Sequence, residues 1–268
     1  MTRSRRPKRG FQVGKLPGFG VWTFLVFFYL YAPLVILVVF SFNANRALTV
    51  WRGFTFDWYR EVFANEGIRR AAVTSLTVAS VATVFATVVA TAAALVLVRG
   101  GRFRGKAVAS GLLMTPLMVP EIVTAVATLA FFSALGVSLG LGKIIIAHCV
   151  FCIPFAYLPI SARLQGMDAT LEQAAHDLYA NDWRTFRRVT LPLLVPGILS
   201  GAILAFIISM DDFIITLMVA EAGSTTLPLY IYGLVRVGVT PEVNAVSSLM
   251  LLVSVVFVLL SFVVGRRR

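Results

Sequence analysis

Six long apolar runs dominate this sequence. Each is almost free of charge and reaches or approaches the ~20 residues that an α-helix needs to cross the ~30 Å hydrocarbon core of a bilayer. The runs are Val21–Phe42, Ala71–Val98, Ala107–Ala134, Ile144–Ala162, Val189–Met210 and Val243–Gly265. A soluble domain would need six helices that are apolar on every side, whereas soluble helices normally keep a polar face. The sequence therefore predicts an all-α, polytopic membrane protein with six transmembrane helices in a single domain, residues 20–265.

Charge predicts the orientation of these helices. The chain is 59% hydrophobic and 13% charged, with a net charge of +12, whereas soluble domains are about 25% charged. With both tails, residues 1–19 and 266–268, on the cytoplasmic side, seventeen Lys and Arg residues lie inside and seven outside. This bias favours an N-in, C-in topology. The positive charge then faces anionic lipid, and no basic surface is left over for a nucleic acid.

The predicted cytoplasmic loop at residues 163–192 is the longest polar interval in the second half of the chain. Within it, Leu171, Ala174, Ala175 and Leu178 recur at helical spacing, which predicts a short helix with one small, apolar face. Such a face needs a partner to cover it. In a membrane protein that partner would be a soluble protein docked at the membrane surface.

Three carboxylates lie within otherwise apolar segments: Glu121, Asp211 and Asp212. Each costs roughly 2.5–3.5 kcal/mol at a helix centre, so it needs a partner, water or a cargo. Glu121 follows Pro120, and a proline-broken helix is tolerated where it lines a cavity. On one continuous helix Asp211 and Asp212 would point about 100° apart. They could attract a cation in transit, or make packing hydrogen bonds or a salt bridge to a neighbouring subunit.

Catalytic and metal-binding chemistry find little support in the sequence. Cys149 and Cys152 share a helical face beside His148, but the order of the residues does not fit a haem-attachment motif and a fourth ligand is missing. We interpret both cysteines as small buried apolar residues. The chain has no glycine-rich nucleotide loop, nucleophile elbow or zinc-binding helix. We therefore expect no enzyme, no metal and no bound cofactor, with energy for transport coming from a partner or an ion gradient.

The loop also carries a recognisable pattern. Gln173-Ala174-Ala175, Asp177-Leu178, Trp183-Arg184 and Leu191-Pro192 resemble the Glu-Ala-Ala loop of inner-membrane permeases of bacterial ATP-binding-cassette (ABC) importers. Residues 209–212, 226–228 and 237–245 are similar to the spermidine/putrescine branch of that family. The resemblance implies a type I ABC importer permease fold in the bacterial inner membrane. It also implies a second homologous permease, two ATPase subunits that carry ATP and Mg²⁺, and a periplasmic or lipid-anchored binding protein.

The same resemblance implies that the helix around residue 174 docks in a groove of the ATPase. The coupling residues would be Glu172, Gln173, Ala174, Ala175, Asp177, Tyr179 and Arg184. Gln173 stands where the family usually has glutamate, and Glu172 is a possible substitute. Tyr179 stands where the family usually has glycine, so we expect the left-handed bend to move to Asn181, which tolerates that conformation better.

The function implied is ATP-driven import of a polyamine by alternating access, with Glu121, Asp211 and Asp212 along the substrate pathway. An ion-gradient-driven transporter or channel, with the same carboxylates as coupling sites, is an alternative. A membrane scaffold that transports nothing, or an importer of another organic solute, is also compatible with the sequence. Co-purification of an ATPase would separate the importer from the first two alternatives.

Overall fold

The structure, a computed structural model, describes residues 18–45, 50–238 and 240–266. Most of the predicted basic tail 1–19, and residues 267–268 of the tail 266–268, lie outside the described residues. Within the described ranges the chain is helical, and its β-structure is limited to one isolated bridge between Asn43 and Phe54. The predicted all-α class is confirmed.

Five helices are long and apolar enough to cross a membrane. They are α1 (Phe19–Phe40), α3 (Glu66–Ala94) with the π-helical segment η2 (Leu95–Arg99), α6 (Leu141–Gln165), α9 (Leu191–Asp211) with the preceding α8 (Asp182–Thr185) and η3 (Phe186–Thr190), and α12 (Pro241–Arg266). A sixth span is the bent pair α4 (Lys106–Met118) and α5 (Glu121–Ala134). The shorter elements are α2 (Asp57–Ala64), α7 (Thr170–Asp177), α10 (Ile214–Val219) and α11 (Leu227–Val237).

The third predicted span is not one continuous helix. Helices α4 and α5 meet at a bend of 108°. Val119 is extended, with ψ of 134°, and Pro120 follows it. Proline disfavours a helical conformation at the residue before it and has no N–H to donate, so α4 ends there. The break places Glu121 at the first turn of α5.

The backbone also leaves the helical conformation at the end of the fifth predicted span, one residue after the predicted end at Met210. Helix α9 stops at Asp211, Asp212 is extended with ψ of 128°, and the short α10 begins at Ile214. The expectation that both aspartates lie on one helix is therefore wrong. Their directions diverge because the backbone leaves the helix between them.

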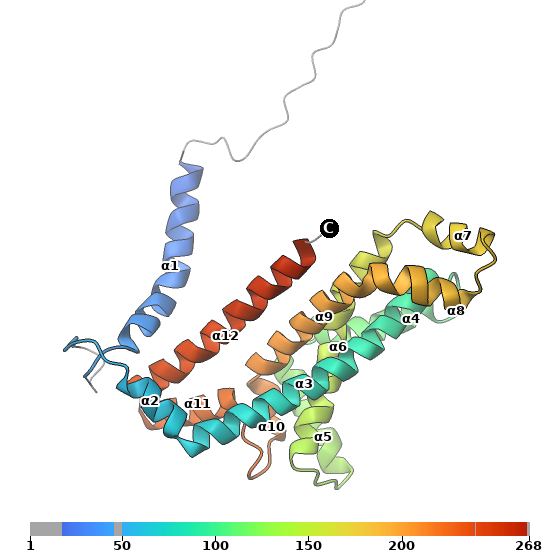
Figure 1. The fold of residues 1–268 in the computed structure, drawn as a ribbon. Coiled ribbons are helices and arrows are strands. Elements are labelled where there is room, and N and C mark those ends of the chain that lie inside the picture. The colour runs from blue at the N-terminus through green and yellow to red at the C-terminus, as the bar shows by residue number, and fades with distance from the viewer. Residues whose placement is uncertain (1–17, 46–49, 239, 267–268) are drawn as a thin grey trace, which may run out of the picture.

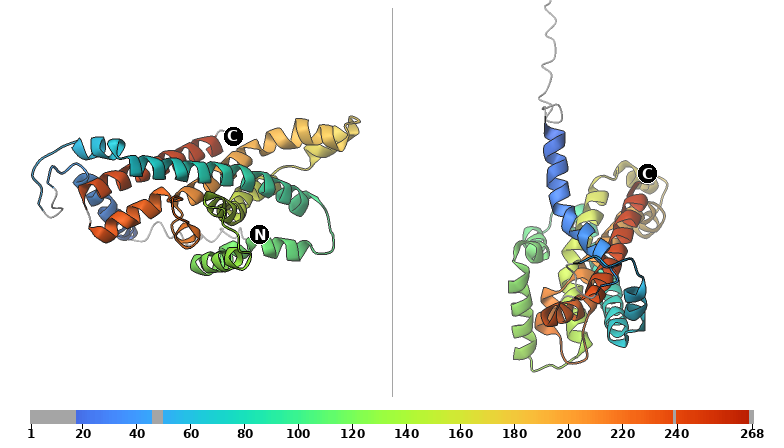
Figure 2. Two further views of the ribbon diagram at one scale, coloured as in Figure 1. Left: turned by 90° about the horizontal axis from the view of Figure 1, so that it is seen from below. Right: turned by 90° about the vertical axis from the view of Figure 1, so that its left-hand side faces the viewer.

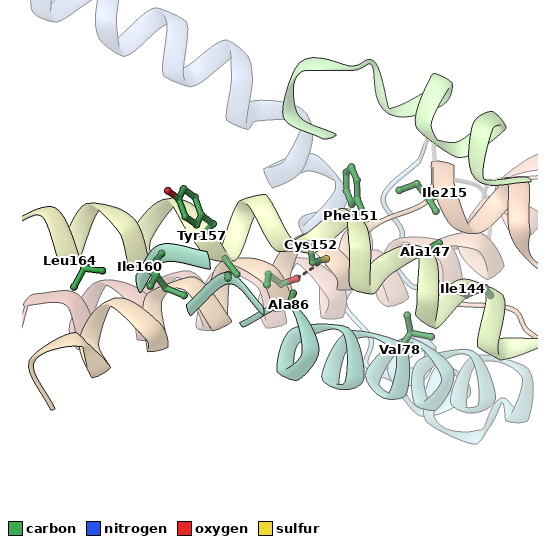
Figure 3. Packing of buried hydrophobic residues seen from close by; sticks show 14 of the residues in the cluster. Val78, Ala86, Ile144, Ala147, Phe151, Cys152, Tyr157, Ile160, Leu164 and Ile215 are labelled. Carbon is green, nitrogen blue, oxygen red and sulfur yellow. Dashed lines mark hydrogen bonds between the residues drawn. The ribbon is translucent and has the colours of Figure 1, made fainter. Parts of the chain in front are cut away.

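The core is formed by α3, α6 and α9, which pack along most of their lengths. Figure 3 shows the side chains that meet there, among them Val78 and Ala86 of α3 and Ile144, Cys152 and Ile160 of α6. Helix α3 contributes mainly alanines at helical spacing, all fully buried: Ala79, Ala82, Ala86, Ala90 and Ala94. Small side chains allow helix backbones to approach closely in a membrane.

The two ends of the molecule differ. Figure 1 shows α7 and α8 at one end of α6 and α9, whereas α2 and α11 lie at the opposite end of the long helices. Helix α1 stands apart from the core in both figures (Figures 1 and 2), contacts α12 and has no buried residue. The elements α7 and α8 belong to the loop 163–192, so they mark the end of the molecule that the sequence predicts to be cytoplasmic.

Glycine allows a close approach of α6 and α9. A Cβ atom at Gly201 would lie 2.5 Å from the Ala156 carbonyl oxygen, whereas one at Gly111 of α4 would meet no atom within 4 Å. We expect Gly201→Ala to cost about 1–3 kcal/mol through overpacking. Gly111→Ala should be neutral or gain up to ~1 kcal/mol of helix propensity. Thermal unfolding in detergent measures both, and an unchanged midpoint for Gly201→Ala would contradict this packing.

Candidate functional site

Helix α7 is exposed at the end of the molecule that the sequence predicts to be cytoplasmic. It covers Thr170–Asp177, close to the predicted helix, and contains no buried residue. The side chains of Gln173, Ala174, Asp177 and Arg184 are exposed and Ala175 is half-buried. The residues that follow α7 are more exposed still, with Leu178 at 81% and Tyr179 at 95%. The loop therefore presents apolar surface that no described part of this chain covers.

Tyr179 reverses the chain after α7. Its φ of 59° is the one positive value at a non-glycine residue in the described ranges. The Ala180 amide donates to the Ala175 carbonyl at 3.0 Å, which is the pattern of a helix end that requires a left-handed residue between the two. The expected shift of the bend to Asn181 is wrong. Asn181 is extended, and its side chain instead accepts from the Arg184 amide to cap α8.

Glu172 points back into the protein. Its Oε2 lies 3.4 Å from Nε of Arg99, and its Oε1 accepts a hydrogen bond from the Thr190 hydroxyl at 2.9 Å. The carboxylate is thus engaged within the chain. Gln173, which follows it, is exposed. Just before α7, Asp168 accepts a hydrogen bond from the Thr170 amide, which holds the pKa of that carboxyl below its usual value.

A second polar cluster lies buried among α6, α9 and α10. His148 is 1% exposed, and its Nε2 lies 3.1 Å from Oδ2 of Asp212. The other ring nitrogen, Nδ1, lies 2.8 Å from the Ser209 hydroxyl. Asp212 also accepts hydrogen bonds from the Ile215 and Thr216 amides and from the Thr216 hydroxyl. A carboxylate is stabilised by the free amides at a helix N-terminus, so Asp212 both ends α9 and caps α10.

The three carboxylates predicted to line the substrate pathway lie at two separate places in the structure. Glu121 lies close to Asp212. Asp211 faces the other way, where it accepts a 3.4 Å hydrogen bond from Ser254 of α12. Glu121 is half-buried and Asp211 is exposed, so these two carboxylates remain accessible, whereas Asp212 is enclosed.

Sequence reasoning assessed His148 only as a metal ligand. No group of three or more potential metal ligands occurs in the part of the chain that the structure describes. Cys149 and Cys152 are buried free thiols, as predicted. Any ionisable residue within a transmembrane segment needs a partner. This rule, which was applied to the three carboxylates, would also have predicted a buried polar partner for His148.

At the end of the molecule opposite α7, Glu221 connects the predicted outside turn at residues 135–142 to the loop after α10. It pairs with Lys143 and accepts hydrogen bonds from the Ser138 hydroxyl and the Gly140 amide. The hydrogen bond from Lys143 is the main reason that the pKa of Glu221 is lowered.

Known proteins resemble this chain along nearly its whole length. The family described as binding-protein-dependent transport system inner membrane components matches residues 82–267. The spermidine/putrescine transport system permease protein PotC of Haemophilus influenzae is 42% identical over 244 residues, which cover 91% of this chain and 95% of the relative. The putrescine transport system permease protein PotI of Escherichia coli is 40% identical over 233 residues, 85% of this chain and 83% of the relative.

Solved structures share the fold. A bacterial ABC transporter involved in the import of the acidic polysaccharide alginate aligns with a TM-score of 0.70 and 17% identity, over 93% of this chain and 96% of that one. The MetNI methionine ABC transporter aligns with a TM-score of 0.61 and 21% identity, over 75% of this chain and 98% of that one. This chain therefore belongs to the family of binding-protein-dependent transport system inner membrane components, as a multi-pass permease with the fold of ABC importer permeases.

Proposed function

We propose that this chain is a permease subunit of an ATP-driven importer in the bacterial inner membrane and that it admits polyamine cations by alternating access. The observation that carries the proposal is the exposed α7 with the turn that follows it. Ala174, Leu178 and Tyr179 form an uncovered surface at the cytoplasmic end of the core helices. An exposed apolar patch of this kind marks a binding surface. Its proposed occupant is an ATPase subunit.

The remaining partners follow from this role. We expect a second homologous permease, a pair of ATPase subunits that hold ATP and Mg²⁺, and a periplasmic or lipid-anchored binding protein. One solved relative is described as a complex with a pentasaccharide-bound periplasmic protein. In the proposed mechanism this chain binds no nucleotide itself, and α7 conveys the closure of the ATPase pair to the spans.

The proposed substrate class has two supports. Relatives that are about 40% identical are named for spermidine and putrescine transport. Glu121 and Asp211 also offer accessible carboxylates within apolar surroundings. A polyamine loses much of its hydration inside a membrane protein, and carboxylates replace part of that interaction. Asp212 would act indirectly, since its own contacts are satisfied by His148 and α10.

The test is transport by the reconstituted complex. The chain is co-expressed with its cognate permease, ATPase and binding protein, and the complex is placed in proteoliposomes. Uptake of labelled spermidine should require both ATP and the binding protein. Uptake that persists without ATP and collapses with the proton gradient would replace this proposal with an ion-driven transporter.

Glu121→Gln and Asp211→Asn should each lower the spermidine uptake rate about tenfold, the usual effect of losing one hydrogen bond to a charged group. Both changes preserve side-chain volume, so the complex should still assemble. Asp57→Asn, on the exposed outer face of α2, is the matched control and should retain wild-type uptake. Normal transport by both pathway variants would remove these carboxylates from the route.

A further inference from the structure

Two π-helical segments lie at the cytoplasmic ends of the core helices. Segment η2 continues α3 and ends at Arg99, and segment η3 precedes α9 and ends at Thr190. These last residues are the two partners of the Glu172 carboxylate, one on each of its oxygens. π-helical turns are rare and occur frequently at functional sites. Here they bring one polar group from each core helix to the same residue of α7.

This contact is well shielded from water. The side chains of Arg99 and Glu172 are 27% and 20% exposed, and Thr190 is 5% exposed. Arg99 also donates from Nη2 to the Met167 carbonyl at 3.0 Å, which fixes the segment that leads into α7. An exposed surface ion pair contributes little. A shielded pair with additional hydrogen bonds fixes geometry more firmly.

Apolar packing does little to hold α7 in place. It has no buried residue, and its main neighbours are α8 and η3, which follow it in the chain. The link from α7 to α3, which lies about 70 residues earlier, is provided by the ion pair between Glu172 and Arg99. Because α7 lacks a packed core, this pair gives a force on its exposed face a direct path to α3, beside the path through η3 and α9.

We infer that Glu172 is a positioning residue that joins α7 to the cytoplasmic ends of α3 and α9, so that the three move as one body. The inference rests on the proposed function, because it assumes that an ATPase displaces α7. Arg99 carries the displacement to α3, and Thr190 carries it to α9. Glu172 therefore sets how much transport each ATP molecule yields, and it does not itself bind the ATPase.

A graded series of variants tests this in the intact importer. Glu172→Leu removes both links, Glu172→Gln removes the ion pair, and Thr190→Val removes only the hydroxyl. We expect ATPase co-purification to stay at the wild-type level in all three. Spermidine imported per ATP hydrolysed should fall about tenfold in Glu172→Leu, which loses both interactions. It should fall about threefold in each of the others, which lose either the ion pair or the hydrogen bond.

Two controls match these changes. Thr190→Ser keeps the hydroxyl, and Glu66→Gln removes a carboxylate from the exposed ion pair with Arg70 at the other end of α3. Both should retain the wild-type ratio. An unchanged ratio in Glu172→Leu and Thr190→Val overturns the inference and leaves the docking proposal standing. Loss of the ATPase from the Thr190→Val complex also overturns it, whereas a wild-type complex without ATPase contradicts the proposed function itself.

A distance measurement gives a readout independent of substrate. Spin labels at Thr170 of α7 and Val96 of η2, both exposed, report the separation of α7 from α3 in the reconstituted complex. In the otherwise wild-type protein we expect the same narrow distance distribution with and without ATP. In the Glu172→Leu background the distribution should broaden and shift on addition of ATP. A shift in the wild-type background would show that α7 and α3 move separately, contrary to the inference.

Discussion

Replacing His148 with leucine is expected to cost about 3–5 kcal/mol, the range observed when one member of a buried ion pair is removed. Leucine fills much of the space but offers nothing to Asp212, whose side chain is 1% exposed. It also leaves the Ser209 and Thr216 hydroxyls without the imidazole nitrogens that they face. Thermal unfolding of the purified protein in detergent, and its yield in membranes, should both fall.

A double-mutant cycle separates this loss from simple overpacking. Adding Asp212→Asn to His148→Leu removes the unpaired charge while keeping an oxygen that the amides of α10 can use. The double variant should therefore recover much of the lost stability. Asp211→Asn, one residue away but exposed, should have little effect on unfolding. If His148→Leu unfolds at the wild-type temperature, the buried cluster does not stabilise the fold.

Ala174→Glu is expected to release the ATPase from the complex. Ala174 is exposed on α7, and both alanine and glutamate are good helix formers, so the permease itself should fold normally. In a docked complex the new side chain adds bulk and carries a charge that must lose its water, which costs several kcal/mol without a partner. Co-purified ATPase should fall at least about tenfold, since about 1.4 kcal/mol already suffices for that.

The matched control is Ala64→Glu, an exposed alanine at the end of α2 on the opposite side of the protein. It should leave co-purification and uptake unchanged. A complex in which Ala174→Glu retains stoichiometric ATPase and wild-type uptake would place the docking surface elsewhere. The structure identifies Ala174 as the better position for this test than Ala175, which is half-buried.

The long helices could be predicted from the sequence because hydrophobicity alone selects segments that cross a membrane. The exposed α7 could also be predicted, since its pattern is local. The breaks within the predicted spans were harder to predict. Pro120 signals a bend, but the angle of 108° depends on where α5 packs. The end of α9 at Asp211 carries no proline or glycine, and it arises from contacts with α10 and α6.

Pairings between distant segments lie beyond local reasoning. His148 and Asp212 are 64 positions apart, and the neighbouring cysteines directed attention to a metal site. Glu172 was considered for a contact with the ATPase, because nothing near it in the sequence points to Arg99. Conformational preference favoured Asn181 over Tyr179 as the residue that makes the left-handed bend after α7. The hydrogen bond from the Ala180 amide to the Ala175 carbonyl at the end of α7 instead requires the left-handed conformation at Tyr179. That conformation costs roughly 1–2 kcal/mol at a residue other than glycine.

Helix α1 has a consequence for how the protein is made. Its helical neighbour, α12, begins at Pro241, so the ribosome must add about 200 residues after α1 before that contact can form. At roughly 5–20 residues per second, this takes about 10–40 s. Throughout that interval α1 has to remain in the bilayer without a helical neighbour from this chain, and its uncharged sequence from Phe19 to Phe40 allows this. Biogenesis, as well as the finished fold, thus constrains its composition.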